Sequence, residues 1–220
     1  MNFNLHTYPL GLLLHFNTTA GRRVTVQQNH LHRWLEIDGV IQSVMSRSHP
    51  SELCLPHQQQ IATLLPTEAS HILGLGLGGG DFVRYFQRCW PASKQEWVEL
   101  DSDVLTLYSL FFQPANTAVT TPPILHHADA LTFMEQSSTH YDLIFLDIFS
   151  QDGNPAMLFQ VPLYRAIARC LTGALIVNLL PRTELEQRCA IALLEQWIGP
   201  TTVYTIPGVI NQILYATQEK

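Results

Sequence analysis

A glycine-rich stretch between an apolar run and a helical pattern is the first feature of this sequence that could do chemistry. The stretch HILGLGLGGGDF contains Gly74, Gly76 and the run from Gly78 to Gly80, and Asp81 follows directly. Because glycine has no Cβ, such a turn lets the backbone approach a ligand closely. The sequence therefore favours a nucleotide-binding turn, and a tight strand-to-helix turn without a ligand is the alternative.

Two acidic residues at the ends of later apolar runs could bind the rest of a nucleoside. Glu99, in VELD, lies about twenty residues past the glycines, where one carboxylate can accept both hydroxyls of a ribose. Asp129, in HADAL, could accept a hydrogen bond from an adenine amino group while the Ala130 N–H meets a ring nitrogen. A solvated strand-end acid and a simple helix N-cap remain the alternatives for these two acids.

Asp147, at the end of the apolar run YDLIFLD, is the candidate for proton transfer. Ligands and catalytic groups gather at the carboxyl edge of an open α/β sheet, and a carboxylate there can accept a proton or hold a substrate cation. Capping of the next loop is the alternative. The sequence contains histidine pairs at 30 and 32 and at 126 and 127, but no third ligand at a suitable spacing, so we expect no metal site.

The order of apolar patterns indicates which elements position these residues. From His71 onward, strand and helix patterns alternate, and the last two strand patterns, TTVYTI and NQILYAT, are joined by Pro207-Gly208. This alternation predicts a mostly parallel sheet of seven strands, covered by helices and ending in an antiparallel hairpin. It is the pattern of the Rossmann-like fold of class I S-adenosylmethionine-dependent transferases, an α/β fold.

A small antiparallel β unit is expected before this sheet. The segment RRVTVQQNHLHRWLEIDGVIQSVMS alternates apolar and polar residues, and Asp38-Gly39 is a hairpin turn signal. We therefore predict an N-terminal β-hairpin unit over residues 1–55 and a nucleoside-binding catalytic domain over residues 56–220.

The composition excludes several classes of partner. The formal net charge is -6, from 12 Lys+Arg against 18 Asp+Glu, and the basic residues form no run, so nucleic acid is not an expected partner. The four cysteines form no CxxC pair, which indicates reduced thiols in a cytoplasmic protein. The apolar stretch PLGLLLHF is too short to span a bilayer, so no membrane association is expected.

The order of these motifs resembles the spermidine synthase family of polyamine aminopropyltransferases. The resemblance runs from about Trp34 to Thr217 and includes LEIDGVIQS, His57 in LPHQQQI, the glycine loop, VELD, HADAL, YDLIFLD and TIPGVINQILYAT. It implies a homodimer that binds decarboxylated S-adenosylmethionine, transfers the aminopropyl group to an amine such as putrescine, and releases methylthioadenosine.

The same resemblance implies a role for each candidate residue. Asp147 would be the catalytic proton acceptor. The cofactor would lie against Gly76, Gly78, Gly79, Asp81, Glu99, Asp129 and Ala130. The small-molecule amine would lie near His57, Ser150 and Asp152.

The sequence departs from the family pattern where the amine groups would bind. Gly79 stands at the place of an acid that binds the aminopropyl amine, with Asp81 two residues later. Ser150 replaces a second amine-binding acid, for which Asp152 could partly substitute, and Ile206 stands at the place of a tyrosine. Three functions therefore stay open: an aminopropyltransferase with an altered acceptor, a methyltransferase using intact S-adenosylmethionine, and a non-catalytic nucleoside-binding paralogue.

Overall fold

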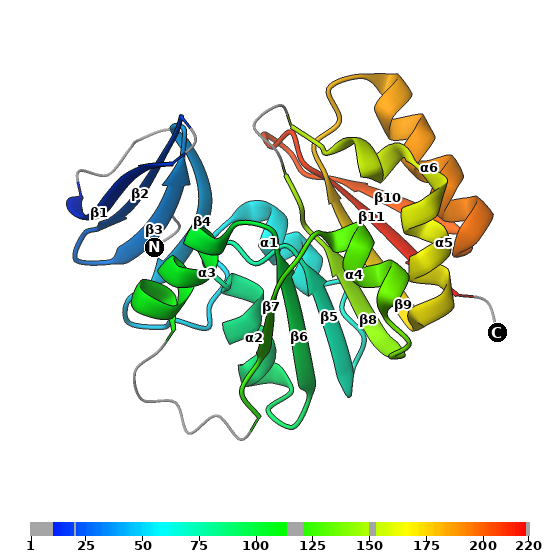
Figure 1. Ribbon diagram of the computed structural model, residues 1–220, viewed down its shortest axis with the longest axis horizontal. Helices are drawn as coiled ribbons and strands as arrows, with labels where there is room; N and C mark the ends of the chain where they lie inside the picture. Colours follow the sequence, from blue (N-terminus) through cyan, green and yellow to red (C-terminus); the bar gives the residue numbers. More distant parts are fainter. Residues whose placement is uncertain (1–10, 20, 114–120, 150–152, 219–220) are drawn as a thin grey trace.

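A small antiparallel sheet lies beside a larger, mostly parallel one in the computed structural model (Figure 1). The structure describes residues 11–19, 21–113, 121–149 and 153–218. The small sheet has the order β1-β2-β3-β4, with neighbouring strands antiparallel. Its strands are β1 (Leu12–Thr19), β2 (Arg22–Gln28), β3 (His32–Ile37) and β4 (Val40–Ser46).

The turn between β3 and β4 is the predicted hairpin turn. Asp38 has φ 50° and Gly39 has φ 81°, the left-handed geometry that a two-residue hairpin loop needs. The Asp38 carboxylate also accepts a hydrogen bond from the Arg23 N–H at 2.7 Å, which ties this turn to β2. The unit is larger than the hairpin that the sequence indicated, because β1 and β2 extend it to four strands.

The large sheet has the order β10-β11-β9-β8-β5-β6-β7. Its strands are β5 (His71–Leu75), β6 (Lys94–Glu99), β7 (Ile124–His127), β8 (Tyr141–Leu146), β9 (Leu171–Leu179), β10 (Thr201–Thr205) and β11 (Gln212–Thr217). The five strands from β5 to β9 are parallel, and β11 pairs antiparallel with both β9 and β10. The predicted fold class, including the closing hairpin, is confirmed.

The helices cover the two faces of this sheet (Figure 1). On the side of the small sheet lie α1 (Pro56–Ala62), α2 (Asp81–Cys89), α3 (Ser102–Leu107) and the π-helical turn η1 (Tyr108–Phe112). On the other side lie α4 (Ala130–Gln136), the 3₁₀ turn η2 (Ala156–Phe159), α5 (Val161–Cys170) and α6 (Glu184–Trp197). Pro162 lies in the first turn of α5, where a backbone N–H would have no partner within the helix. Its missing N–H therefore costs no hydrogen bond, and the proline is compatible with the start of this helix.

Two apolar clusters hold these layers together. One packs the sheet against α4, α5 and α6, and the other packs it against α1 to α3 and the small sheet. In the second cluster Phe86 and Trp97 are fully buried, each contributing about 1.5–3 kcal/mol of transfer free energy. A Cβ on Gly74 would lie 2.0 Å from the Trp97 ring, so only glycine at this position of β5 leaves room for the indole.

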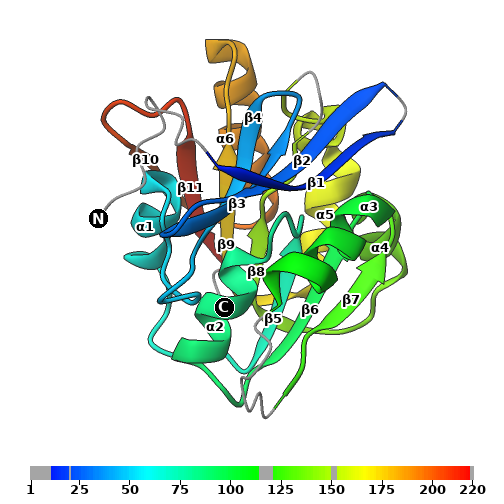
Figure 2. The same ribbon diagram turned by 90° about the vertical axis from the view of Figure 1, so that its left-hand side faces the viewer.

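The small sheet approaches the carboxyl ends of the parallel strands. Figure 2 shows it from the side, above α2, α3 and the end of β6. Arg22 of β2 forms a 2.8 Å ion pair with Asp101, directly after β6, and Asn17 of β1 donates to Asp103 at 3.3 Å. The β unit therefore lies over the edge where the candidate site residues are expected. Within the described part of the chain, no helix combines the length and hydropathy that a membrane span requires.

Candidate nucleoside and proton-transfer site

The candidate residues gather at one edge of the large sheet because β5, β6, β7 and β8 are parallel and end together. The glycine loop follows β5, Glu99 ends β6, Asp129 lies two residues after β7, and Asp147 follows β8. The Ala128 N–H donates to the Glu99 carbonyl at 3.1 Å, and the Asp147 N–H donates to the Leu75 carbonyl at 2.8 Å. These backbone bonds hold four segments that are distant in sequence side by side at the carboxyl edge of the sheet.

Gly76 is the position where the glycine loop needs its glycine most. Its φ is 98°, and a Cβ would lie only 2.0 Å from the Asp147 carbonyl oxygen. The chain therefore passes directly against the backbone that carries the candidate proton acceptor. This close approach connects the loop to Asp147 through backbone geometry.

The N–H groups of the glycine loop are largely used within the protein. Gly76 donates to the Val98 carbonyl at 2.8 Å, and Gly80 donates to the Leu77 carbonyl at 2.9 Å. Leu77 donates to Glu99 Oε2 at 3.1 Å, and Gly79 donates to Ser43 Oγ at 2.6 Å. A loop that binds a pyrophosphate needs its N–H groups free, so this loop is poorly suited to a phosphate group and better suited to a nucleoside without one.

Glu99 is anchored by both of its oxygens. Oε2 accepts from the Leu77 N–H at 3.1 Å, and Oε1 accepts from the Asp101 N–H at 3.0 Å. Each carboxylate oxygen has a further lone pair, so the group can accept two hydroxyl donors without losing these bonds. The half-buried Glu99 thus has the fixed orientation and the free capacity that a ribose diol would use.

Asp129 is the N-cap of α4, as one of the two alternatives predicted. Its Oδ1 accepts from the Thr132 N–H at 2.9 Å and from the Thr132 hydroxyl at 3.1 Å. Both bonds use Oδ1, which leaves Oδ2 to accept a donor from a base. Ala130 follows as the first residue of α4 and is buried. Capping and base recognition are therefore compatible at this position.

The pKa of the Asp147 carboxyl is shifted well above its usual value. The pKa of this half-buried carboxyl is raised to about 6, mainly by burial and in smaller part by the negative charges of Asp81 and Glu99, although a hydrogen bond from Asn178 lowers it. The Asn178 Nδ2 donates to Asp147 Oδ1 at 2.8 Å. A carboxyl of this pKa is ionised at neutral pH and still basic enough to take up a proton.

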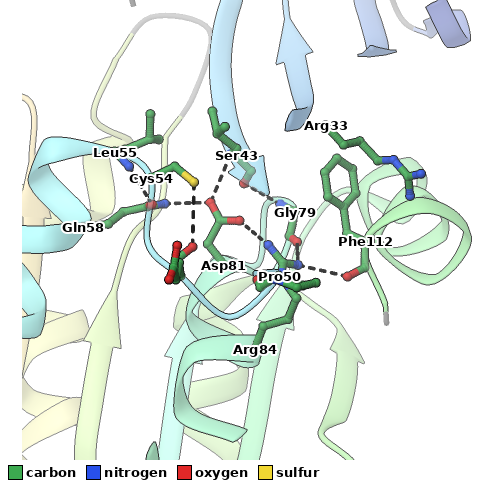
Figure 3. A network of polar contacts seen from close by, with 12 residues as sticks. Arg33, Ser43, Pro50, Cys54, Leu55, Gln58, Gly79, Asp81, Arg84 and Phe112 are labelled. Carbon is green, nitrogen blue, oxygen red and sulfur yellow. Dashed lines mark hydrogen bonds and ion pairs between the residues drawn. The ribbon is translucent and has the colours of Figure 1, made fainter. Parts of the chain in front are cut away.

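The side chain of Asp81 is engaged in a buried network, a different environment from the cofactor contact that the sequence indicated. Figure 3 shows Asp81 pointing toward Gln58 and Arg84. Its Oδ2 accepts from the Gln58 side chain at 2.8 Å and from the Val44 N–H at 3.2 Å, and its Oδ1 pairs with Arg84. Both oxygens are therefore used in a site that excludes water, an environment that favours a structural role, while the cofactor contact of Asp81 stays a prediction.

The Arg84 guanidinium completes this network under the glycine loop. It donates to the carbonyls of Gly79 and Phe112, and to that of Pro50 at 2.8 Å (Figure 3). The carbonyl of Gly79 is therefore held by Arg84 and its N–H by Ser43. The small sheet and α2 together fix the backbone of the loop.

The space beside Gly79 is already filled. The φ of Gly79 is not positive, so the backbone itself would allow a side chain there. A Cβ, however, would lie 2.7 Å from the Ser43 Cβ and 3.2 Å from the Phe112 ring. Ser43, which the sequence did not mark as a site residue, therefore takes the place where the resemblance implies an acid.

The residues implied for amine binding are only partly described. His57 lies in the first turn of α1, and burial lowers its pKa to about 4, which keeps the ring neutral at physiological pH. Ser150 and Asp152 lie outside the described residues. Among the described residues, no three His, Cys, Asp or Glu side chains are grouped in a way that could hold a metal ion.

Asn178 is the residue that the sequence reasoning missed at this edge. It ends the apolar strand segment GALIVN, is 1% exposed, and bonds directly to Asp147. An amide inside an otherwise apolar strand is a usable signal, because buried polar side chains are almost always hydrogen-bonded. Asn211, which bonds to Asn178, lies before β11 and carries no such signal.

Comparison with known proteins identifies the family. The spermine/spermidine synthase domain model matches residues 58–206, most of the chain. The chain belongs to this family. The polyamine aminopropyltransferase of Neisseria meningitidis is 27% identical over 168 residues, which cover 72% of this chain and 62% of the relative. The eEF1A lysine and N-terminal methyltransferase of Mus musculus is 28% identical over 156 residues, covering 66% of this chain and 22% of the relative.

Solved structures agree on the fold. A probable spermidine synthase from Corynebacterium glutamicum superposes with a TM-score of 0.76 at 19% identity, covering 96% of this chain and 81% of that chain. Human methyltransferase-like protein 13, solved in complex with SAH, superposes with a TM-score of 0.67 at 23% identity, covering 76% and 83%. The present chain spans less than two thirds of the length of the aminopropyltransferase from Neisseria, and its reaction is argued separately below.

Proposed function

We propose that this protein is a transferase that moves an aminopropyl group from decarboxylated S-adenosylmethionine to an amine acceptor such as putrescine. The carrying observation is Asp147, a carboxyl of raised pKa whose backbone touches the glycine loop. Membership of the spermine/spermidine synthase family supports this reaction class. Glu99 would hold the ribose, Asp129 and Ala130 the adenine, and the loop at Gly76 and Gly78 would pass along the sulfonium side of the nucleoside.

The chemistry requires what Asp147 offers. An alkylamine has a pKa of about 10, so it arrives as an ammonium ion that cannot attack carbon. The Asp147 carboxylate would bind this ammonium and take its proton as the nitrogen forms a bond to the carbon beside sulfur. The sulfonium supplies its own leaving group when bound, because the carbon–sulfur bond breaks to give a neutral thioether. The remaining task of the chain is to align donor and acceptor.

A second candidate is methyl transfer from intact S-adenosylmethionine. Ser43 beside Gly79 favours it, because a hydroxyl at this place neither repels a cofactor carboxylate nor holds an ammonium as an acid would. The methyltransferase relative, of which this chain covers a small part, is consistent with this candidate. With an amine as the small molecule that accepts the methyl group, Asp147 would serve the same purpose in both reactions.

Binding and product analysis together test the proposal. Calorimetry with methylthioadenosine, S-adenosylmethionine and its decarboxylated form should show binding of the first and third, and mass spectrometry with putrescine should show spermidine. Tight binding of S-adenosylmethionine alone would replace the first candidate by the second. No binding of any of the three would leave only a non-catalytic role.

The variant Asp147→Asn is the matched control for chemistry. It keeps the shape of the side chain and should bind methylthioadenosine as the wild type does, while transfer falls by about 10²-fold or more. Turnover at the wild-type rate would show that another group accepts the proton. We also propose that the protein acts in the cytoplasm on a small-molecule amine and forms a homodimer. Light scattering after size-exclusion chromatography would test the dimer.

A further inference from the structure

Two asparagine amides stand in series behind Asp147. Asn178, on β9, donates from Nδ2 to Asp147 Oδ1 at 2.8 Å. Asn211, just before β11, donates from Nδ2 to Asn178 Oδ1 at 2.9 Å. The first amide is 1% exposed, so its hydrogen bonds are made with protein groups in the interior. β9 and β11 are adjacent strands, and the end of β9 lies beside the start of β11. This pairing brings the two residues together.

The bond from Asn211 fixes which side of the Asn178 amide faces the carboxylate. An amide has one donor end and one acceptor end, and a rotation by half a turn exchanges them. Asn211 presents a donor, which only the oxygen of Asn178 can accept. The NH₂ group of Asn178 is therefore left to point at Asp147, where it serves an ionised carboxylate better than a second oxygen would.

We propose that Asn178 is a positioning residue for Asp147 and that Asn211 sets its orientation. The proposal rests on the function proposed above, in which Asp147 accepts a proton. By binding Oδ1, Asn178 would hold the carboxylate in one rotamer and leave Oδ2 as the oxygen that receives the proton. In this arrangement Asn178 on β9 and Asn211 before β11 act on the chemistry through Asp147.

The Asn178 amide opposes the effect of the negative charges around Asp147. Asp81 from α2 and Glu99 from β6 are both negative, and together with burial they raise the pKa of the carboxyl. The Asn178 bond is the contact that lowers it. Without that bond the pKa would rise above about 6, and more of the carboxyl would be protonated at neutral pH. The acidic limb of the rate profile would then move to higher pH, because only the ionised form can accept a proton.

Two readouts on three variants test the proposal. In protein labelled with ¹³C at aspartate, the Asp147 side-chain signal, assigned by its loss in Asp147→Asn, is titrated by NMR, and kcat/KM is measured over the same pH range. We expect Asn178→Ala to raise the Asp147 pKa by about one unit or more and to move the acidic limb with it, since losing a charge-assisted bond is an effect of this size. Asn211→Ala should give a smaller shift in the same direction.

Asn154→Ala is the matched control. Asn154 is also a buried amide near the end of β9, but it bonds to the Leu180 backbone, accepting from the Leu180 N–H at 3.1 Å, and donates to the Glu186 carboxylate at 3.4 Å. It should leave the Asp147 titration unchanged even where it lowers stability. A shift as large as that of Asn178→Ala would show that any buried amide loss perturbs the site, and it would overturn the proposal.

The remaining outcomes separate positioning from function. If Asn178→Ala leaves the Asp147 pKa within about 0.3 unit of wild type, Asn178 does not set the carboxyl and the proposal is wrong. If the NMR titration shifts but no transfer is detected in any protein, the positioning stands and the proposed reaction fails. Should Asn178→Ala not fold, Asn211→Ala carries the test. Alanine cannot donate and adds no charge, so the Asn178 amide would lose the bond that orients it and the Asp147 pKa should rise; an unchanged pKa would overturn the proposal.

Discussion

Replacing Asp147 by asparagine should stabilise the protein at neutral pH while it abolishes the proposed reaction. The carboxyl has a folded-state pKa of about 6 because it is buried near other acids, whereas an unfolded aspartate titrates at about 3.9. The folded state therefore binds the proton more tightly. Stability from this group is fully present below the unfolded pKa and is lost as the pH rises toward 6 and beyond.

The size of the effect follows from the two pKa values. A difference of about two units corresponds to about 3 kcal/mol of unfolding free energy in all, most of which is lost between pH 4 and pH 8. The side chain is half-buried and keeps some contact with solvent, so about 1.5–3 kcal/mol is expected. The neutral amide of Asp147→Asn does not ionise. The variant should thus exceed the wild type by this amount at pH 8 and approach it near pH 4.

Urea unfolding at several pH values measures this difference directly. The free energies of wild type and Asp147→Asn are compared between pH 4 and pH 8, with Glu135→Gln, the loss of an exposed carboxylate on α4, as the control. The control should stay within about 0.5 kcal/mol of the wild type throughout. If Asp147→Asn is no more stable than the wild type at pH 8, or if the gap does not depend on pH, the carboxyl is not destabilised by its environment and our account of its basicity is wrong.

Three further variants test the loop and its supports. Gly76→Ala should lower the unfolding free energy by about 2 kcal/mol or more and weaken methylthioadenosine binding, because φ is 98° and the new Cβ would meet a carbonyl oxygen 2.0 Å away; wild-type stability in urea would contradict this. Arg84→Met should cost about 3–5 kcal/mol by leaving a buried carboxylate unpaired, whereas the exposed Arg88→Met on the same helix should change stability by less than about 0.5 kcal/mol. Ser43→Ala should weaken methylthioadenosine binding by about 5-fold or more in calorimetry, since the loop loses its anchor, while Ser46→Ala on the same strand should not; equal effects would show that the anchor does not matter.

Local pattern and composition were sufficient to predict the scaffold. Alternating strand and helix signals gave the parallel sheet, because each element is defined by apolar periodicity and caps within a few residues. The Asp38-Gly39 turn, the helix cap at Asp129 and the closing hairpin all follow from neighbours in sequence, and all three are present. The spacing of glycines and strand-end acids also indicated the edge of the sheet where they meet.

Contacts between distant segments decided what the sequence could not. Asp81 follows the glycines directly, but Gln58 and Arg84 turn its carboxylate into a buried network that no local pattern reveals. Ser43 reaches Gly79 from 36 residues earlier, and its contact depends on how the small sheet packs over the loop.

The environment of the candidate base is likewise a product of the tertiary structure. The sequence placed Asp147 at the end of a buried strand, which is sufficient to mark it as a candidate. Its raised pKa depends on burial, on the charges of Asp81 and Glu99 and on the opposing bond from Asn178, and Asn178 in turn contacts Asn211, just before β11; these groups meet only when the sheet is assembled. Residue types and their spacing therefore determined the fold and the candidate groups, whereas packing set the charge and direction of each group, because both depend on partners that are remote in the chain.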